Sequence, residues 1–198
     1  MEQRFARALR TVQTLLEQAA VTLQVPIPFA LIGGLAVSAW GAVRATQDID
    51  LLADSNPSPL GNLHLRSDLK KFLEKKGCVA EWRLGDVDDP IPLLLRLELP
   101  RPLHPLGADI LWAHKRWQRE ALLRKVAVKV SRFEVFVLHP EDLILMKLEA
   151  GGPQDLLDVR ALLSNPPPEL NRHRLKRKAA QLRLSSALER CLRVVRSR

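Results

Sequence analysis

The sequence predicts an α+β fold, in which a mixed β-sheet with flanking helices is followed by a C-terminal helical region. Short apolar runs bounded by Gly, Pro and Asp turns recur up to residue 138, and apolar residues at helical spacing dominate after Pro140. Of the 198 residues, 46% are hydrophobic, which is enough to bury a core. We expect a core at residues 1–138 and a helical region with a basic tail at residues 139–198.

The first half of the chain predicts two helices around the first strands. Apolar residues recur every three or four positions over residues 2–24, and Pro26 ends this helix. The run IPFALIGG reads as a short buried strand that enters a turn, and small apolar residues suit a helix over residues 35–41. DIDLLA then alternates as a strand, and a further helix is expected over residues 66–76.

Strands are expected next, and helices after them. The predicted strands are CVAEWR, LLLRLEL, GADILWA, VAVKV and FEVFVL, with the acidic turn GDVDDP between the first two. HPEDLILMKLEA has a proline near its first helical turn and acidic residues behind it, which favours a helix start. Gly151, Gly152 and Pro153 end this helix and begin the next, PQDLLDVRALL, and the basic tail after NPPPEL has helical spacing.

The positive charge of the chain lies in its tail. Residues 171–198 contain ten Lys and Arg residues and one acidic residue, whereas residues 1–170 contain 21 of each sign, so the whole net charge of +9 falls in the tail. Such a block attracts phosphate backbones or solvates one face of a helix. Both interpretations stay open from the sequence.

Two carboxylates, Asp48 and Asp50, are separated by one isoleucine in the predicted strand. Side chains alternate along a strand, so both aspartates point to one side, about 7 Å apart, while Ile49 points into the core. Two carboxylates this close repel each other unless a cation lies between them. Mg²⁺, which prefers a few carboxylates together with substrate phosphates, suits this pair.

A glycine pair precedes these aspartates. Gly33 and Gly34 follow the first predicted strand and provide a turn without side chains. A phosphate could therefore approach the backbone N–H groups at the start of the following helix. The turn would hold a triphosphate while the aspartates hold its metal ion.

The chain contains Gly33-Gly34, then thirteen intervening residues, and then Asp48-Ile49-Asp50. This pattern resembles the signature of the nucleotidyltransferase superfamily, whose fold is shared with DNA polymerase β. The resemblance implies that Asp48, Asp50 and a third carboxylate bind divalent ions, and Asp109 in GADILWA has the matching context. It also implies that Asp109 helps to deprotonate the attacking hydroxyl. The fold implied is a nucleotidyltransferase-type mixed sheet, and the cofactor implied is Mg²⁺ or Mn²⁺, with an NTP as substrate.

HPEDLILMKLEAGGPQDLLDVRALL is similar to the helical region of AbiEii/AbiGii-type and related bacterial nucleotidyltransferases. By this resemblance Lys147 reaches the nucleotide phosphates and Asp155 orients Lys147 or the acceptor. The implied function is Mg-dependent transfer of an NMP to an acceptor hydroxyl. This enzyme could be a toxin that modifies RNA or tRNA through basic residues 172–198 and has a cognate antitoxin. Arg44, four residues before Asp48, would contact phosphate or acceptor, or pair with an acidic side chain.

Each candidate residue also has a structural interpretation. Asp109 could cap the next helix, and Lys147 and Asp155 could form a surface ion pair on adjoining helices. Asp158, one turn after Asp155, suits an ion pair with Arg160 or a tail arginine. Gly34 stands where many active family members have serine, which motivates the alternative of a catalytically degenerate, regulatory or antitoxin-like binding protein. A basic nucleic-acid-binding protein without catalysis is a third hypothesis.

Other classes of protein fit less well. The chain has two widely separated cysteines and no His or Cys spacing typical of a zinc site, and it contains no G-x-G-x-x-G, P-loop or G-x-S-x-G motif. It has no uncharged apolar run of eighteen residues, and its polar N-terminus is unlike a secretory signal. We therefore expect a cytoplasmic protein without a membrane partner.

Overall fold

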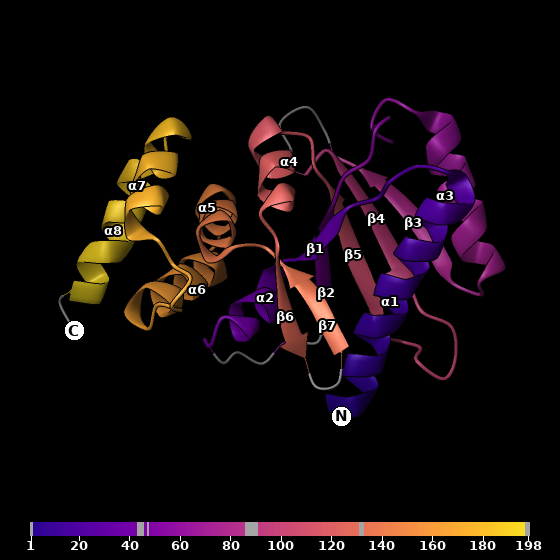
Figure 1. Ribbon diagram of the computed structural model, residues 1–198, viewed down its shortest axis with the longest axis horizontal. Coiled ribbons are helices and arrows are strands. Elements are labelled where there is room, and N and C mark those ends of the chain that lie inside the picture. The colour runs from indigo at the N-terminus through magenta and orange to yellow at the C-terminus, as the bar shows by residue number, and fades with distance from the viewer. Residues whose placement is uncertain (1, 43–45, 47, 86–90, 131–132, 197–198) are drawn as a thin grey trace.

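A computed structural model of the chain describes residues 2–42, 46, 48–85, 91–130 and 133–196. These residues form one seven-stranded sheet and eight helices (Figure 1). The predicted α+β fold, with a mixed sheet, flanking helices and helices at the C-terminal end, is confirmed. The division of the chain at residue 138 stays a prediction.

The sheet is mixed, and its strands have the order β3-β4-β5-β2-β1-β7-β6. The two inner pairs β2–β5 and β1–β7 are parallel, while β1–β2, β3–β4, β4–β5 and β6–β7 are antiparallel. The strands are β1 (Phe29–Leu31), β2 (Ile49–Ala53), β3 (Val79–Leu84), β4 (Leu93–Glu98), β5 (Gly107–Trp112), β6 (Val126–Val130) and β7 (Phe133–Val137). As a result, β1, β4 and β7 end on the side of the sheet where β2 and β5 begin. The candidate site lies at these strand ends.

The helices form two groups, which Figure 1 separates. In that view α1 and α3 lie side by side over the sheet, and α5 to α8 are gathered at the left, with α7 and α8 outermost. The first four helices are α1 (Glu2–Leu23), α2 (Gly33–Ala39), α3 (Leu63–Lys75) and α4 (Arg116–Leu123). The last four are α5 (Pro140–Ala150), α6 (Pro153–Ser164), α7 (Arg172–Gln181) and α8 (Ser185–Arg196). Across the described residues, no helix has the length and apolar character needed to cross a membrane.

One face of the sheet is covered and the other is partly open at β4 and β5. Along β4 and β5, side chains of one face, such as Leu95 and Ile110, are fully buried. Trp112 continues this face and packs against Trp82, whose indole N–H donates to the Arg66 carbonyl of α3. The alternate side chains, among them Arg96 and Asp109, are only half-buried. The sheet therefore presents polar groups on a partly solvated face, as mixed and antiparallel sheets can.

The main differences between the observed elements and the sequence expectations concern α2, α3, α4 and the basic tail. Helix α2 begins and ends two residues earlier than predicted, and α3 begins at Leu63 because the Asn62 side chain accepts a hydrogen bond from the Leu65 N–H. Helix α4 was not predicted at all. The basic tail forms two helices, since the chain turns at Arg183, which has φ 59°. Most of the predicted turn GDVDDP lies outside the described residues.

Candidate functional site

Two of the predicted carboxylates lie on neighbouring strands at paired positions. Asp50 of β2 is the direct Cα partner of Asp109 of β5 in the parallel register. Paired residues point to the same side of a sheet, so both side chains lie on the partly open face. The strand pairing therefore brings together two residues that are 59 positions apart in the sequence.

Gly33 lies directly against Asp50. Its φ of 64° belongs to the left-handed region, and a Cβ built on it would lie 2.0 Å from Asp50 Oδ2. The neighbouring Ile32 N–H donates to the Asp50 carbonyl at 2.9 Å, which fixes the turn to β2. Gly34 follows in the first turn of α2 and is buried. A side chain at position 33 would therefore displace the Asp50 carboxylate.

Asp48 was predicted as the first residue of the strand, but β2 begins at Ile49, so Asp48 precedes the strand and is exposed. Its backbone N–H donates to Thr46 Oγ1 at 3.3 Å. Arg44, the predicted contact to phosphate or acceptor, lies outside the described residues, as do Val43, Ala45 and Gln47.

The sequence interpretation missed Arg96, which binds Asp109. Arg96 of β4 is the Cα partner of Asp109, and its Nε and Nη2 donate to Asp109 Oδ1 at 2.9 Å and Oδ2 at 2.6 Å. This hydrogen bonding and the charge of Asp109 raise the pKa of the Arg96 guanidinium, which stays positively charged. The alternation in LLLRLEL places Arg96 on the face opposite Leu95 and Leu97, but the sequence does not show which strand lies beside it.

The predicted metal site can be tested against the side chains that are present. Considering only residues that the structure describes, no three His, Cys, Asp or Glu side chains are grouped closely enough to hold a metal ion. A carboxylate offers about four acceptor positions, so Asp109 keeps acceptor capacity after receiving two hydrogen bonds from Arg96. Carboxylate oxygens are the donor type that Mg²⁺ prefers. The donor set thus fits a divalent ion by type, and the three-carboxylate site stays a prediction.

A cavity of about 250 Å³ gathers five of the predicted residues. They come from four parts of the chain, namely the glycine turn, two strands and the helix pair α5–α6. These residues are Gly33, Asp50, Asp109, Lys147 and Asp155. Apolar side chains such as Leu94 and Met146 complete the lining, so the cavity combines a polar end with an apolar wall.

A second cavity, of about 370 Å³, lies at the edge where β2 and β5 begin. Asp48, Arg96 and Asp109 line it together with Glu98 and the segment 105–108. Asp109 belongs to both cavities and so connects Asp48 on one side with Asp50 and Gly33 on the other. The two cavities together offer space for a ligand that spans the carboxylates.

Lys147 is held by two carboxylates of the following helix. Its Nζ lies 2.9 Å from Asp155 Oδ1 and 2.7 Å from Asp158 Oδ2, and its side chain is 7% exposed. Gly151 ends α5 in the left-handed conformation, so the chain turns back and brings α6 beside Lys147. Asp158 thus pairs with Lys147 and also accepts a hydrogen bond from the Gln154 side chain at 3.0 Å, while its expected pairing with Arg160 or a tail arginine stays a prediction. Binding of phosphate by Lys147 stays a prediction.

Helix α7 of the basic tail is attached to two buried acids at the start of α5. Asp142, 1% exposed, accepts hydrogen bonds from Lys178 at 2.7 Å and from Arg124 at 3.0 and 3.1 Å. Glu141, fully buried, contacts His139, accepts a hydrogen bond from the Asn171 N–H at 2.9 Å, and has Arg174 at 3.9 Å.

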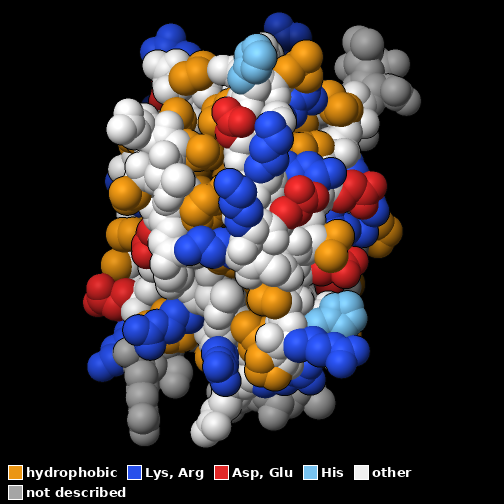
Figure 2. Space-filling model, turned by 90° about the vertical axis from the view of Figure 1, so that its right-hand side faces the viewer, with side chains coloured by type: hydrophobic (Ala, Val, Ile, Leu, Met, Phe, Trp, Pro, Cys, Tyr) orange, Lys and Arg blue, Asp and Glu red, His pale blue; other side chains and the backbone are white. Residues whose placement is uncertain are grey.

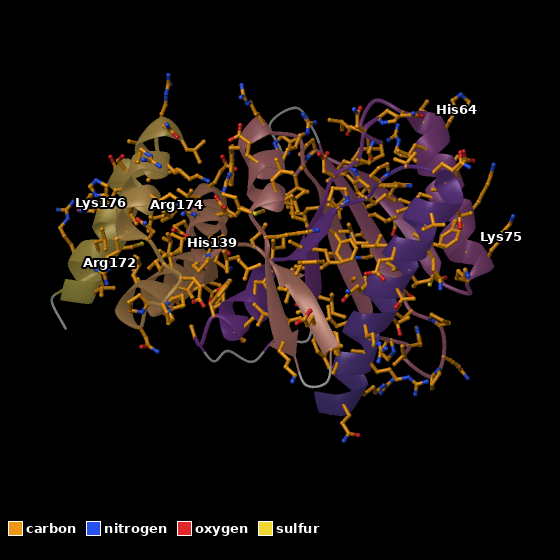
Figure 3. The ribbon with its side chains drawn as sticks, viewed as in Figure 1. His64, Lys75, His139, Arg172, Arg174 and Lys176 are labelled. Atoms are coloured by element: carbon orange, nitrogen blue, oxygen red, sulfur yellow. The ribbon has the colours of Figure 1, made fainter. Side chains whose placement is uncertain are left out.

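The position of Glu141 affects its protonation. Burial alone would raise the pKa of Glu141, but hydrogen bonds from His139 and from the backbone N–H groups of Glu141 and Asn171 outweigh it, so the pKa lies below its ordinary value. Figure 3 shows Arg174 on the α5 side of α7, and Arg172 and Lys176 on its outer side. Part of the positive charge of the tail therefore faces buried acidic side chains inside the protein.

The remaining basic side chains of the tail lie away from the candidate site. The described linings of the two carboxylate cavities include no residue of the segment 172–196. In Figure 1, α5 and α6 lie between α7–α8 and the sheet. On the α3 side of the molecule, which Figure 2 faces, basic, acidic and hydrophobic side chains are intermingled.

No family model matches the chain, and no curated protein matches it. Matched solved structures include an antigenic nucleotidyltransferase-like protein from Paracoccidioides brasiliensis, with a TM-score of 0.49, 20% identity and coverage of 92% of this chain and 93% of that chain. ANT(2")-Ia in complex with adenylyl-2"-tobramycin gives a TM-score of 0.49 at 16% identity, covering 90% of this chain and 95% of that one.

The lincosamide antibiotic adenylyltransferase LnuA, lincomycin-bound, gives a TM-score of 0.46 at 13% identity, covering 80% of this chain and 96% of that chain. The TM-scores of all three likenesses are below 0.5.

Proposed function

We propose that the chain is a divalent-metal-dependent nucleotidyltransferase, which moves a nucleoside monophosphate from an NTP to an acceptor hydroxyl. The observation that supports this most is the pairing of Asp50 with Asp109 beside Gly33, in a cavity that also contains Lys147 and Asp155. Paired carboxylates next to a backbone turn without side chains suit a nucleotide with its metal ion.

The proposed roles follow from position. Asp48 and Asp50 would hold the ion with Asp109, and the backbone at Gly33 and Gly34 would face the phosphates. When bound, the ion would neutralise part of the negative charge of the triphosphate. The acceptor oxygen would attack the α-phosphorus, its proton would pass to Asp109, and the bond from the α-phosphorus to the bridging oxygen would break with release of pyrophosphate.

For the acceptor we favour a small hydroxyl compound over RNA. An RNA acceptor was expected on condition that the basic tail lies beside the active cleft. The described cavity linings contain no tail residue, and Arg174 and Lys178 are directed to Glu141 and Asp142. An RNA- or tRNA-modifying toxin of the AbiEii type, with its antitoxin, remains the proposal for the case in which RNA is labelled.

The test is incubation with each α-³²P-labelled NTP and Mg²⁺, in separate reactions with total RNA, total protein and a small-molecule extract. Label is expected on a small molecule, and Asp48→Ala and Asp50→Ala variants should transfer none. Omission of the divalent ion by chelation should also abolish transfer. Absence of label in every reaction would contradict the proposal.

A non-catalytic binding protein is the second candidate, and the Arg96–Asp109 pair favours it. Both oxygens of Asp109 accept hydrogen bonds from Arg96, as in a structural ion pair. Gly34 in place of serine points the same way. This candidate predicts that ATP binds, as measured by calorimetry, while no acceptor is labelled.

A further inference from the structure

Three charged side chains lie in a row across adjacent strands. Asp50, Asp109 and Arg96 are successive Cα partners on β2, β5 and β4, and all three point to the partly open face. Two neighbouring carboxylates require a cation close by. The guanidinium of Arg96 lies where it neutralises Asp109.

The Arg96–Asp109 pair is accessible, unlike the pair of Arg124 with Asp142, which also shares two hydrogen bonds. The side chains of Arg96 and Asp109 are 42% and 28% exposed. In the pair of Arg124 with Asp142, the exposed fractions are 29% and 1%. A partly exposed ion pair costs less to break than one with a buried carboxylate, so Arg96 can exchange its partner more readily than Arg124 can.

Arg96 also lies next to the other predicted ligand. It lines the cavity of about 370 Å³ together with Asp48 and Asp109. The charges of Glu81 and Asp48 add smaller contributions to the effect of Asp109 in raising the Arg96 pKa. A guanidinium has a planar set of donors that binds phosphate in the same bidentate manner as carboxylate.

We propose that Arg96 is a positioning residue that exchanges partners: it holds Asp109 in the unliganded chain and binds a phosphate group of the nucleotide when a divalent ion takes Asp109. This inference rests on the proposed function. Arg96 and the ion then compete for the carboxylate of Asp109. When the nucleotide binds, its phosphate group gives the Arg96 guanidinium another anion to pair with, so the ion can bind Asp109. No covalent step is involved.

The competition can be measured without turnover, with Mn²⁺ alone as the probe. We expect Arg96→Gln to bind Mn²⁺ about threefold to tenfold more tightly than the unsubstituted chain in electron paramagnetic resonance titrations, because the competing cation is gone. The same variant should bind Mn²⁺-ATP about tenfold more weakly in calorimetry, because one charge-assisted pair to phosphate is lost. Arg96→Lys, which keeps the charge but not the planar donors, should show intermediate values in both titrations.

Arg116→Gln is the matched control. Arg116 lies on helix α4 and forms an exposed ion pair with Glu120 at 2.9 Å. It lines neither carboxylate cavity within the described part of the chain. Its removal should leave both affinities unchanged, and thermal unfolding of every variant checks that the fold persists.

Mn²⁺ affinity that is unchanged or weaker in Arg96→Gln overturns the exchange, and so does failure of Mn²⁺ to bind either protein. Tighter Mn²⁺ binding with unchanged ATP affinity overturns the phosphate contact. If the exchange is observed but the chain labels no acceptor, the proposed function fails while this inference stands. If the chain labels an acceptor and Arg96→Gln leaves Mn²⁺ and ATP affinities unchanged, only the inference fails.

Discussion

Gly33 and the carboxylate of Asp50 occupy adjoining space, because a Cβ on Gly33 would lie 2.0 Å from Asp50 Oδ2. Position 33 also has a φ of 64°, which disfavours any residue with a side chain. The backbone and the carboxylate are therefore closer than a side chain at position 33 would allow. Whatever binds at Asp50 meets a peptide group at Gly33 with no side chain in between.

The first prediction concerns Gly33→Ala. The substitution should lower the free energy of unfolding by about 1–3 kcal/mol, because it combines left-handed backbone strain with a shift of Asp50. Nucleotidyl transfer should fall by more than about tenfold, since Asp50 moves. Denaturant unfolding and the labelling assay measure the two effects.

Gly61→Ala is the control for this substitution. A Cβ on Gly61 would meet no heavy atom within 4 Å, and its backbone lies outside the left-handed region. Stability within about 0.5 kcal/mol of the unsubstituted protein is expected. Equal effects of the two substitutions would contradict the proposed contact between Gly33 and Asp50.

The second prediction separates catalysis from stability at Asp48. Because Asp48 is exposed, Asp48→Ala should leave the melting temperature unchanged, while nucleotidyl transfer falls by about a hundredfold or more. Glu98→Ala removes another exposed carboxylate from the same cavity and should retain activity. Comparable losses in both variants would show that the cavity needs negative charge in general, and that Asp48 has no special role.

The third prediction concerns the buried cation of α5. Lys147→Met leaves Asp158, 4% exposed, without its ammonium partner, so a loss of about 3–5 kcal/mol in unfolding free energy is expected. The double variant Lys147→Met, Asp158→Leu should regain most of this loss. Lys70→Met, which breaks an exposed pair with Glu74, should cost less than about 1 kcal/mol.

The fourth prediction is a pH dependence caused by Glu141. The pKa of Glu141 in the folded chain lies below the ordinary value of 4.5, so its ionisation stabilises the fold above about pH 4.5. That stabilisation is lost as the pH falls through the folded-state pKa. Glu141→Gln should therefore show a weaker fall of unfolding free energy between about pH 5 and pH 3 than the unsubstituted chain.

Urea unfolding at several pH values measures this effect. Glu169→Gln, at an exposed position, serves as the control and should keep the pH profile of the unsubstituted chain. A profile for Glu141→Gln that runs parallel to the unsubstituted one would exclude Glu141 as the source.

The sequence predicted most of the fold because apolar periodicity marks the helices and strands that bury one side. DIDLLA and GADILWA were both expected as strands, and they are adjacent in the sheet. Helix α4 escaped prediction because it spans only eight residues, too few to show a clear helical period of apolar side chains. The turn within the tail escaped as well, since Arg183 carries no Gly or Pro signal.

The candidate site was only partly predictable. Asp48 and Asp50 are close along the chain, so strand alternation predicted both on one face, although β2 begins only at Ile49. The partner of Asp109 depends on which strand lies beside β5, and a single sequence does not specify this, so Arg96 was missed. The pairing of Lys147 with Asp158 depends in the same way on how α6 packs against α5.

Asp142 joins parts of the chain that lie on either side of the expected boundary at residue 138. It receives Arg124, the residue that follows α4, and Lys178 from α7, so detachment of α7 would leave Lys178 without this carboxylate and Asp142 with Arg124 alone. Separating the two parts would expose a carboxylate that is now 1% accessible, together with the apolar residues around it. The last helices and the sheet should therefore melt in one cooperative transition, and a shortened chain that stops before Asn171 should fail to reach the folded state.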